Sequence, residues 1–401
     1  MKTIRRKYII AQAIKPILKM ILPYIYNIHY HYEHFEEVKP PYFIMGNHTS
    51  ALDPFIMSMG NHHHINYVTN DEYFRFPIIK LFMKLMGAIP KTKFMSDYKT
   101  VKDILELRKE NAVIGIYPEG GRTWPGKTQE LLFATSKLIK KMEIPVVVVV
   151  TKGGCLAFPR WGKKFRRGRV DVHFKALYRP EDITSLSAED IHKGLEHALS
   201  NDDIVWQKEN TIPFKGKKLV ERLEWFIYAC PKCEGLESMT SLNDIYTCRC
   251  GYSVKYNEYG FFEENGSGEV LYDNVNDWND YQHNHFKQLI QKWFDDPNSK
   301  EFCFKKDNCT LKKGKRGEKN LVEVLTGTLF LTKQGFRIAD AINSVMMDTE
   351  HVSGLVVNHK NVIDFYHNGE KYRIQLQSKN ECGYILEDAM KILKEIQIKK
   401  Q

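Results

Sequence analysis

Short apolar runs alternate with segments of helical periodicity through the first part of the chain. Residues 42–45, 112–117 and 146–150 are almost continuously apolar and contain many Val and Ile residues. Such runs are typical of strands that a parallel sheet buries on both faces. Residues 101–109 and 129–141 lie between the runs and have apolar positions at helical spacing. The pattern predicts an α/β domain with a mostly parallel sheet.

Two further helical segments lead out of this domain. Residues 188–207 predict one continuous helix, and residues 219–228 predict another. The lysine-rich stretch 215–218 lies between them. We therefore expect a domain boundary near residues 210–228.

The last part of the chain has the pattern of a small antiparallel sheet closed by a helix. Residues 362–366 and 371–376 flank Asn368-Gly369, a pair that favours a type I′ hairpin turn because both central residues need positive φ. Residues 385–398 predict the closing helix. We expect the basic run 312–317 to be a solvated loop.

The first 32 residues combine basic side chains with apolar positions at helical spacing. Arg5-Arg6-Lys7 leads into this stretch, and the combination favours an interfacial helix on a phospholipid surface. The longest uncharged run within these 32 residues, Met20–Tyr32, contains Pro23 and is shorter than the ~20 apolar residues that span a bilayer. We expect membrane contact without a transmembrane helix. The alternative is a helix that packs on its own domain.

The net charge indicates the class of partner, and the cysteine pattern indicates the cellular compartment. The chain has 59 Lys and Arg against 49 Asp and Glu, a net charge of +10. This excess favours an anionic partner, which could be a phospholipid surface, a phosphorylated substrate or nucleic acid. Four of the eight cysteines lie between positions 230 and 250, and the others have no framework spacing. This is typical of a reducing, cytosol-facing protein.

The four clustered cysteines have the spacing of a metal site. Cys230 and Cys233 form a C-x2-C pair, and Cys248 and Cys250 form a C-x-C pair followed by Gly251. Four thiolates suit a closed tetrahedral zinc site, as in a zinc ribbon, with a structural role. The alternative is a pair of disulfides, which a reducing compartment disfavours. A nucleic-acid role for the ribbon stays open as a lesser alternative, and its protein partners are unknown.

A histidine and an aspartate follow the first strand. His48 and Asp53 are five positions apart, and five residues of a regular helix would turn their side chains ~140° apart. We therefore expect His48 to precede the helix. Ser50 and Asp53 form a capping-box pattern that places Asp53 in the first turn. There its carboxylate can orient the imidazole as a general base; alternatively, Asp53 is only a cap and His48 is structural.

A glycine-containing turn follows the strand at 112–117. Its sequence is Pro118-Glu119-Gly120-Gly121-Arg122-Thr123. Open α/β sheets bind ligands at the carboxyl ends of strands, and Arg122 offers a planar fork suited to phosphate. The alternative is an ordinary turn with a surface arginine.

Together these segments resemble the lysophospholipid and glycerolphosphate acyltransferase family over residues 40–175. The family motif N-H-x4-D corresponds to Asn47-His48-x4-Asp53, and its F-P-E-G-T-R motif corresponds to residues 117–122. A third block covers residues 87–93, and a fourth lies around Ile144-Pro145-Val146.

The resemblance implies that His48 is the general base and that Asp53 orients it. It further implies a set of substrate-binding residues: Asn47, Lys91, Lys93, Glu119, Gly120, Gly121 and Arg122. Two of these depart from the family pattern. Gly121 replaces the usual Thr or Ser, and Lys91 or Lys93 replaces an arginine of the third block. A lysine neutralises phosphate as a point charge, without a bidentate fork.

The implied reaction transfers a fatty acyl group from an acyl thioester, on coenzyme A or acyl carrier protein, to the free hydroxyl of a lysophospholipid. We expect 1-acylglycerol-3-phosphate as the acceptor and phosphatidic acid as the product, without a catalytic cofactor. The alternatives are another lysolipid acceptor and a catalytically idle lipid-binding scaffold. A hydrolase is disfavoured because the chain has no G-x-S-x-G elbow.

We expect the chain to lie in the cytoplasm, peripherally associated with the inner face of the membrane. The final part faintly resembles a pleckstrin-homology or GRAM-like module. The expected organisation is a basic amphipathic membrane-contacting segment over 1–35, an acyltransferase domain over 36–210, a linker helix over 211–228, a zinc ribbon over 229–258 and a β-rich domain with a terminal helix over 259–401.

Overall fold

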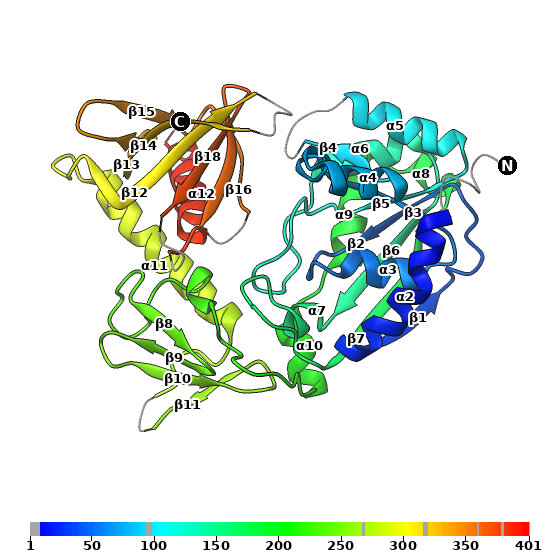
Figure 1. The fold of residues 1–401 in the computed structure, drawn as a ribbon, viewed down its shortest axis with the longest axis horizontal. Coiled ribbons are helices and arrows are strands. Elements are labelled where there is room, and N and C mark those ends of the chain that lie inside the picture. Colours follow the sequence, from blue (N-terminus) through cyan, green and yellow to red (C-terminus); the bar gives the residue numbers. More distant parts are fainter. Residues whose placement is uncertain are drawn as a thin grey trace. The chain divides into compact units, whose positions relative to one another are not determined.

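A computed structural model of the chain describes residues 9–92, 98–266, 269–315, 320–358, 361–377 and 381–400 (Figure 1). The expected basic start Arg5-Arg6-Lys7 lies outside these residues. The chain forms two compact units, Met1–Lys217 with Glu258–Gly260, and Lys218–Asn257 with Phe261–Gln401. Among the described helices, none is long and apolar enough to cross a membrane.

The first unit has seven strands and the helices that cover them. Its strands are β1 (Asn27–Glu33), β2 (Tyr42–Gly46), β3 (Ile65–Asn70), β4 (Ile89–Lys91), β5 (Val113–Ile116), β6 (Val146–Lys152) and β7 (Arg169–Tyr178). Its helices are α2 (Ile9–Ile25), α3 (Asp53–Gly60), η1 (Asp71–Arg75), α4 (Pro77–Leu85), α5 (Tyr98–Lys109), α6 (Phe133–Met142), α7 (Gly154–Ala157), α8 (Pro180–Ser185), α9 (Ala188–Leu199) and α10 (Asp203–Asn210).

These strands form one sheet in the order β1-β7-β6-β2-β5-β3-β4. Strand β2 runs parallel to its neighbours β5 and β6, and β3 runs parallel to β4 and β5. Strand β7 is antiparallel to β6. The expected α/β domain is confirmed, and its sheet is mixed. Because β2 to β6 share one direction, their carboxyl ends meet at one edge of the sheet.

Strand β2 lies at the centre of the core. Phe43 and Met45 belong to a buried cluster with Ile139 of α6 and Leu195 of α9. On the other face, the Tyr42 hydroxyl donates a hydrogen bond to Asn61, directly after α3, and α2 and α3 lie in front of the sheet in Figure 1. Burial on both faces explains the continuous apolar runs of these strands.

The single helix expected over residues 188–207 is wrong, because the structure divides it into α9 and α10. The Asp202 carboxylate accepts hydrogen bonds from the backbone N–H groups of Ile204 and Val205, 2.8 and 3.2 Å away. Asp202 therefore caps a new helix. The missed signal is the run Ser200-Asn201-Asp202, three residues that all favour the cap position.

The second unit begins with a short turn and a four-stranded antiparallel sheet. Its elements are η2 (Leu223–Trp225), β8 (Met239–Leu242), β9 (Ile245–Cys248), β10 (Ser253–Tyr256) and β11 (Phe262–Glu264), with the order β11-β10-β9-β8. The helix expected over 211–228 is wrong. Lys218 and Arg222 have φ of 62° and 80°, and the Arg222 N–H bonds to the Ser241 hydroxyl. The positive φ values limit helical structure to the short turn η2, and the backbone at Val220 and Arg222 bonds to the small sheet.

The rest of this unit is a seven-stranded antiparallel sheet with two helices. The elements are α11 (Val275–Asp295), β12 (Phe302–Gly314), β13 (Val322–Thr332), β14 (Gly335–Ala339), β15 (Ser344–Asp348), β16 (Val352–Val357), β17 (Val362–His367), β18 (Glu370–Leu376) and α12 (Tyr384–Ile398). The strand order is β15-β14-β13-β12-β18-β17-β16. The likeness to a pleckstrin-homology or GRAM-like module stays a prediction.

Two expectations on this sheet are tested by its register. The hairpin at Asn368-Gly369 is confirmed, because His367 pairs with Glu370 and the two turn residues have φ of 51° and 76°. The solvated loop over 312–317 is wrong in its first half. Residues 312–314 continue β12 and pair with β18, where the Lys313 ammonium lies 2.5 Å from the Glu370 carboxylate.

Candidate active site

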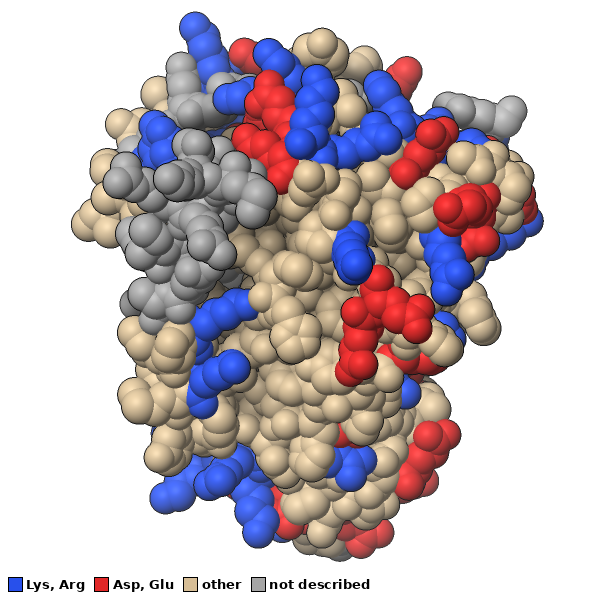
Figure 2. Space-filling model, turned by 90° about the vertical axis from the view of Figure 1, so that its right-hand side faces the viewer, with Lys and Arg blue, Asp and Glu red and all other residues tan. Residues whose placement is uncertain are grey.

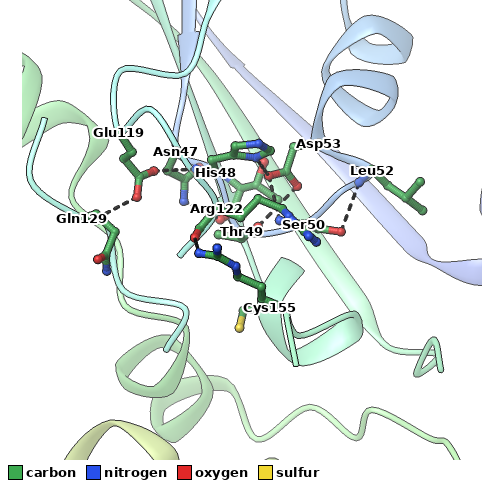
Figure 3. A network of polar contacts seen from close by, with 12 residues as sticks. Asn47, His48, Thr49, Ser50, Leu52, Asp53, Glu119, Arg122, Gln129 and Cys155 are labelled. Atoms are coloured by element: carbon green, nitrogen blue, oxygen red, sulfur yellow. Dashed lines mark hydrogen bonds and ion pairs between the residues drawn. The ribbon is translucent and has the colours of Figure 1, made fainter. Parts of the chain in front are cut away.

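The residues of both hallmark segments meet at the carboxyl edge of the first sheet. The loop after β2 carries His48, and the turn after the neighbouring strand β5 carries Glu119 and Arg122 (Figure 3). The Thr123 N–H donates to the His48 carbonyl over 2.9 Å, which joins the two loops directly. A hollow lined by Pro41, Asn111 and Pro145 lies at the opposite, amino edge.

His48 and Asp53 form a hydrogen-bonded pair. His48 precedes α3, Asp53 is its first residue, and the His48 Nδ1 lies 2.9 Å from Asp53 Oδ2. The Ser50 N–H donates to the same carboxylate at 2.8 Å. The Asp53 side chain is 1% exposed and that of His48 is 19% exposed. The buried partner therefore holds an imidazole whose other edge can reach solvent.

The capping pattern at this helix differs in one detail from the expectation. The Asp53 carboxylate reaches back to the Ser50 N–H, as a capping box requires. The Ser50 hydroxyl, however, accepts from the Leu52 N–H at 3.3 Å. Helix α3 has Leu52 as its N-cap, without a side-chain hydrogen bond.

An aromatic ring supports the imidazole from one face. The Tyr117 ring stacks on His48 with centroids 4.2 Å apart, and Tyr67 stacks behind Tyr117 at 6.2 Å. Burial raises the pKa of Tyr117 well above its ordinary value, so this phenol stays neutral. Sequence reasoning assigned no role to Tyr117; the available signal was its place before Pro118, where the family motif has Phe.

Glu119 is tied to the backbone of the protein. Its two carboxylate oxygens accept hydrogen bonds from the His48 N–H at 2.6 Å and from the Gln129 N–H at 2.8 Å. Burial raises its pKa to about 7, against the opposing effect of these two donors. In the structure, Glu119 therefore links the His48 loop to the segment at Gln129, whereas we expected it to bind substrate.

Asn47 is engaged in a similar way. Its side-chain amide donates to the Thr151 carbonyl at 3.0 Å and accepts from the Thr151 N–H at 2.8 Å. Asn47 is buried, so its amide connects the loop after β2 to the end of β6. The expected role in substrate binding does not match this arrangement.

Arg122 keeps the position expected for a substrate ligand. Its side chain is partly exposed, and among the described residues no hydrogen bond or ion pair involves its guanidinium. Its carbonyl accepts from Arg160 at 2.6 Å, and the Arg160 guanidinium lies over the Trp124 ring at 4.1 Å. Gly120 has φ of 71°, and a Cβ added at Gly121 would meet no atom within 4 Å, so the turn leaves open space there.

The two lysines of the third block lie farther away or outside the description. Lys91 ends β4, which is separated from β2 by β5 and β3. Three strand spacings of about 4.8 Å put it roughly 14 Å along the edge from β2. Lys93 lies outside the described residues. The structure thus brings Arg122 next to His48 and leaves Lys91 at the far side of the same edge.

A third loop, after β6, completes the edge. The buried Asp203 accepts hydrogen bonds from the N–H groups of Gly153 and Cys155 at 2.9 and 2.8 Å. A Cβ at Gly154 would lie 2.2 Å from the Thr49 hydroxyl, so only glycine allows this loop to approach the residue after His48. The sequence offered no signal for Asp203, because its partners are some fifty positions away.

The four expected zinc ligands come together in the second unit. The sulfur atoms of Cys230 and Cys250 are 3.8 Å apart, and those of Cys233 and Cys248 are 3.7 Å apart. All four lie within 4.8 Å of one another. All four are free thiols, which disagrees with the alternative of two disulfides.

The raised pKa of Glu119 predicts a pH dependence of stability. Its pKa rises from an ordinary 4.5 to about 7 on folding. Between these values the folded protein holds a proton that the unfolded chain has lost, so stability from this group falls as pH rises. Urea unfolding of wild type and Glu119→Gln should show a wild-type advantage that shrinks between pH 4.5 and 7. A difference that stays constant across this range would contradict the assignment.

Part of the chain is similar to known acyltransferases. Residues 27–152 match the family model described as Acyltransferase. The chain is 27% identical over 152 residues to the 1-acyl-sn-glycerol-3-phosphate acyltransferase of Saccharomyces cerevisiae, covering 36% of this chain and 50% of the relative. It is 27% identical over 116 residues to the chloroplastic 1-acyl-sn-glycerol-3-phosphate acyltransferase BAT2 of Brassica napus, covering 28% of this chain and 33% of that one.

The chain therefore spans half the length of the yeast relative and a third of the Brassica relative. Among solved structures, it is similar to the 1-acyl-sn-glycerophosphate acyltransferase PlsC of Thermotoga maritima, with a TM-score of 0.41, 16% identity and coverage of 50% of this chain and 79% of that one. The sequence comparisons support an acyltransferase domain over residues 27–152, the segment that carries His48, Asp53 and Arg122.

Proposed function

We propose that this chain transfers a fatty acyl group from an acyl thioester to the free hydroxyl of 1-acylglycerol-3-phosphate, forming phosphatidic acid. The observation that carries the proposal is the buried Asp53 carboxylate bonded to Nδ1 of a partly exposed His48, one strand away from Arg122. The match of residues 27–152 to the acyltransferase model supports the reaction class. The names of the two relatives suggest the acceptor.

The geometry suggests how the His48 imidazole acts. With Nδ1–H donated to Asp53, Nε2 carries the lone pair that would take the proton of the acceptor hydroxyl. The alkoxide oxygen then attacks the thioester carbonyl and forms a tetrahedral adduct. When this adduct collapses, the C–S bond breaks and the imidazolium returns its proton to the leaving thiolate. The donor is coenzyme A or acyl carrier protein thioester, and the chemistry requires no cofactor.

The acceptor phosphate would be held by Arg122. Its guanidinium offers two parallel N–H donors to phosphate oxygens, and the open space beside Gly121 leaves room for a ligand. Lys91, farther along the edge, would contribute to the positive field that attracts the phosphate. In this proposal, Asn47 and Glu119 position the loops and do not touch the substrate.

The test is an acyl-transfer assay with lysophosphatidic acid and both acyl donors. His48→Ala should lower kcat by about 10²- to 10⁴-fold, the usual contribution of a general base. Arg122→Ala should raise KM for the acceptor about tenfold or more, as expected for a lost charge-assisted hydrogen bond, and should leave KM for the donor unchanged.

Matched variants control for general damage. His62→Ala and Arg179→Ala alter exposed side chains outside the site and should keep wild-type rates. Far-ultraviolet circular dichroism should show that His48→Ala is folded. Near-wild-type turnover by folded His48→Ala would overturn the mechanism, and equal loss with a lysolipid that lacks a phosphate would overturn the role of Arg122.

We also propose that the first unit binds the inner face of a phospholipid membrane through α2 and α4. Helix α2 exposes Ile17, Met20, Ile21 and Tyr24, with Met20 64% exposed, while Leu22 is buried. Lys19 of the same helix is exposed as well, and Figure 2 shows a face of largely uncharged side chains at its centre, with basic and acidic side chains at its upper and lower ends. This combination suits a helix lying at a lipid interface.

Helix α4 repeats this arrangement, which sequence reasoning missed. None of its residues is buried; Ile78 is 85% exposed, and Leu81 is exposed as well. Lys80 and Lys84 are exposed on the same helix and can pair with anionic headgroups. Exposed apolar side chains that lie together on a protein surface, as on α4, mark an interaction site.

Vesicle sedimentation tests this surface. The double variant Ile78→Glu with Leu81→Glu should bind vesicles of phosphatidylglycerol and phosphatidylcholine at least about tenfold more weakly, because it buries charge in the interface. The matched control is Ile342→Glu, since Ile342 is 90% exposed but lies in the second unit. Equal loss in both variants, or no loss in either, would contradict the assignment.

We further propose that Cys230, Cys233, Cys248 and Cys250 hold a structural zinc ion. Zinc–sulfur bonds of ~2.3 Å give a tetrahedron with edges of about 3.8 Å, and the two sulfur separations given above, 3.7 and 3.8 Å, match this edge. Four thiolates leave no open position, so the ion would stabilise the small sheet β8 to β11 and take no part in acyl transfer.

Metal analysis of the purified chain tests the thiolate site. We expect about one zinc ion per chain bound through sulfur, and Cys230→Ser with Cys248→Ser should lose it and lower the unfolding temperature. Cys303→Ser, which changes a cysteine outside the cluster, should retain the metal. The proposal would be wrong if the purified wild-type chain contained no zinc and did not bind added zinc.

A further inference from the structure

The same set of metal-binding side chains gathers at two other places, each with two imidazoles and one carboxylate. One cluster is His31, Asp171 and His173 in the first unit; the other is Asp348, His351 and His367 in the second. In each, one ligand atom per residue lies within 4.8 Å of the others. Neither the acyl-transfer chemistry nor the thiolate cluster accounts for them.

We propose that Asp348, His351 and His367 form a second metal site, for zinc or a similar divalent transition ion. The carboxylate lies between the two imidazoles: its Oδ1 is 2.5 Å from His351 Nδ1, and its Oδ2 is 3.1 Å from His367 Nε2. Imidazole with carboxylate is a ligand set that suits zinc and its neighbours, and disfavours calcium and magnesium.

The side chains can adjust to an ion at low cost. Ligand atoms around a tetrahedral zinc at ~2.1 Å are about 3.4 Å apart, so the present separations of 2.5 and 3.1 Å must widen by up to about 0.9 Å. His351 is exposed, and His367 is largely buried against the sheet. One fixed and one movable imidazole can therefore open around an ion, and water would complete the coordination.

Local charge distinguishes this cluster from the one in the first unit. Glu350 lies beside His351 and adds negative potential. Among the described residues, no lysine or arginine is paired with Asp348, although Lys394 donates to the nearby Val352 carbonyl. Asp171, in contrast, is paired with Arg169 at 3.2 Å, and Lys152 lies close enough to His173 to oppose its positive charge. Only the second-unit cluster has a carboxylate free of a cationic partner.

The position in the fold gives such an ion a structural consequence. Strands β15 and β16 are the two outer edges of the seven-stranded sheet, yet a turn of three residues, 349–351, connects them. Asp348 ends β15, His351 precedes β16, and His367 ends β17, the neighbour of β16. An ion held by all three would therefore clip the two edges of the sheet together at this corner.

The experiment uses the full chain, first loaded with zinc at the thiolate cluster and then desalted. Calorimetric titration with zinc chloride should show about one further ion bound per chain. A thermal unfolding scan with zinc present should show a higher unfolding temperature of the second unit. Loss of a group that only supports a metal ligand already lowers metal affinity about 10- to 100-fold. Removing a ligand itself, as in His351→Ala or His367→Ala, should therefore weaken zinc binding at least about tenfold. The matched control is His31→Ala with His173→Ala, which should bind like wild type.

Cobalt distinguishes the two sites of the second unit, because only thiolate ligands give intense sulfur-to-metal absorption. Cys230→Ser with Cys248→Ser should lose that absorption and keep the weaker bands of a nitrogen and oxygen site. His351→Ala changes an exposed side chain, so it keeps the test valid if His367→Ala fails to fold. No binding beyond the thiolate ion, or loss of binding in the His31 and His173 control instead, would overturn the proposal.

Discussion

The buried carboxylate of Asp53 is the interaction on which the candidate site depends. It accepts hydrogen bonds from the His48 imidazole and from the Ser50 backbone, and it lies at the first turn of α3, where the helix dipole favours negative charge. A carboxylate that is almost fully buried is costly unless each of its oxygens is satisfied. Both of these bonds reach Oδ2, and Oδ1 accepts a hydrogen bond from the Thr49 hydroxyl at 3.4 Å. The bond from His48 also fixes the imidazole in one orientation.

Two other buried carboxylates hold the neighbouring loops by the same physics. Glu119 joins the His48 loop to the segment at Gln129, and Asp203 gathers the loop after β6. Burial raises the pKa of both, to about 7 for Glu119 and about 6 for Asp203. These acids bind backbone N–H groups, so the site is assembled by main-chain contacts. Among the described residues, no hydrogen bond or ion pair involves the Arg122 guanidinium, which our proposal assigns to the acceptor phosphate.

The second unit has a buried core of its own and also gathers two sets of side chains that could hold a metal ion. Its small sheet β8 to β11 carries four thiols at the spacing of a tetrahedral ion, which suits a short segment that cannot bury much apolar surface. Its larger sheet is open at β15 and β16, and the cluster of Asp348, His351 and His367 lies where those edges meet. In our two proposals, an ion at each cluster would add to the stability of the second unit.

Local patterns along the chain determined the central strands, the Asn368-Gly369 hairpin, the pairing of His48 with Asp53 and the cysteine cluster. Each depends on residues that are close in sequence or on a period set by backbone geometry. Tertiary structure alone decided that Glu119 and Asn47 hold backbone, that Tyr117 supports the imidazole, and that residues 219–228 are not a helix. These outcomes depend on partners that are tens of positions away, such as Thr151 for Asn47. Hydrogen bonds between segments so far apart produce no periodic pattern in the sequence, so the sequence could not predict them.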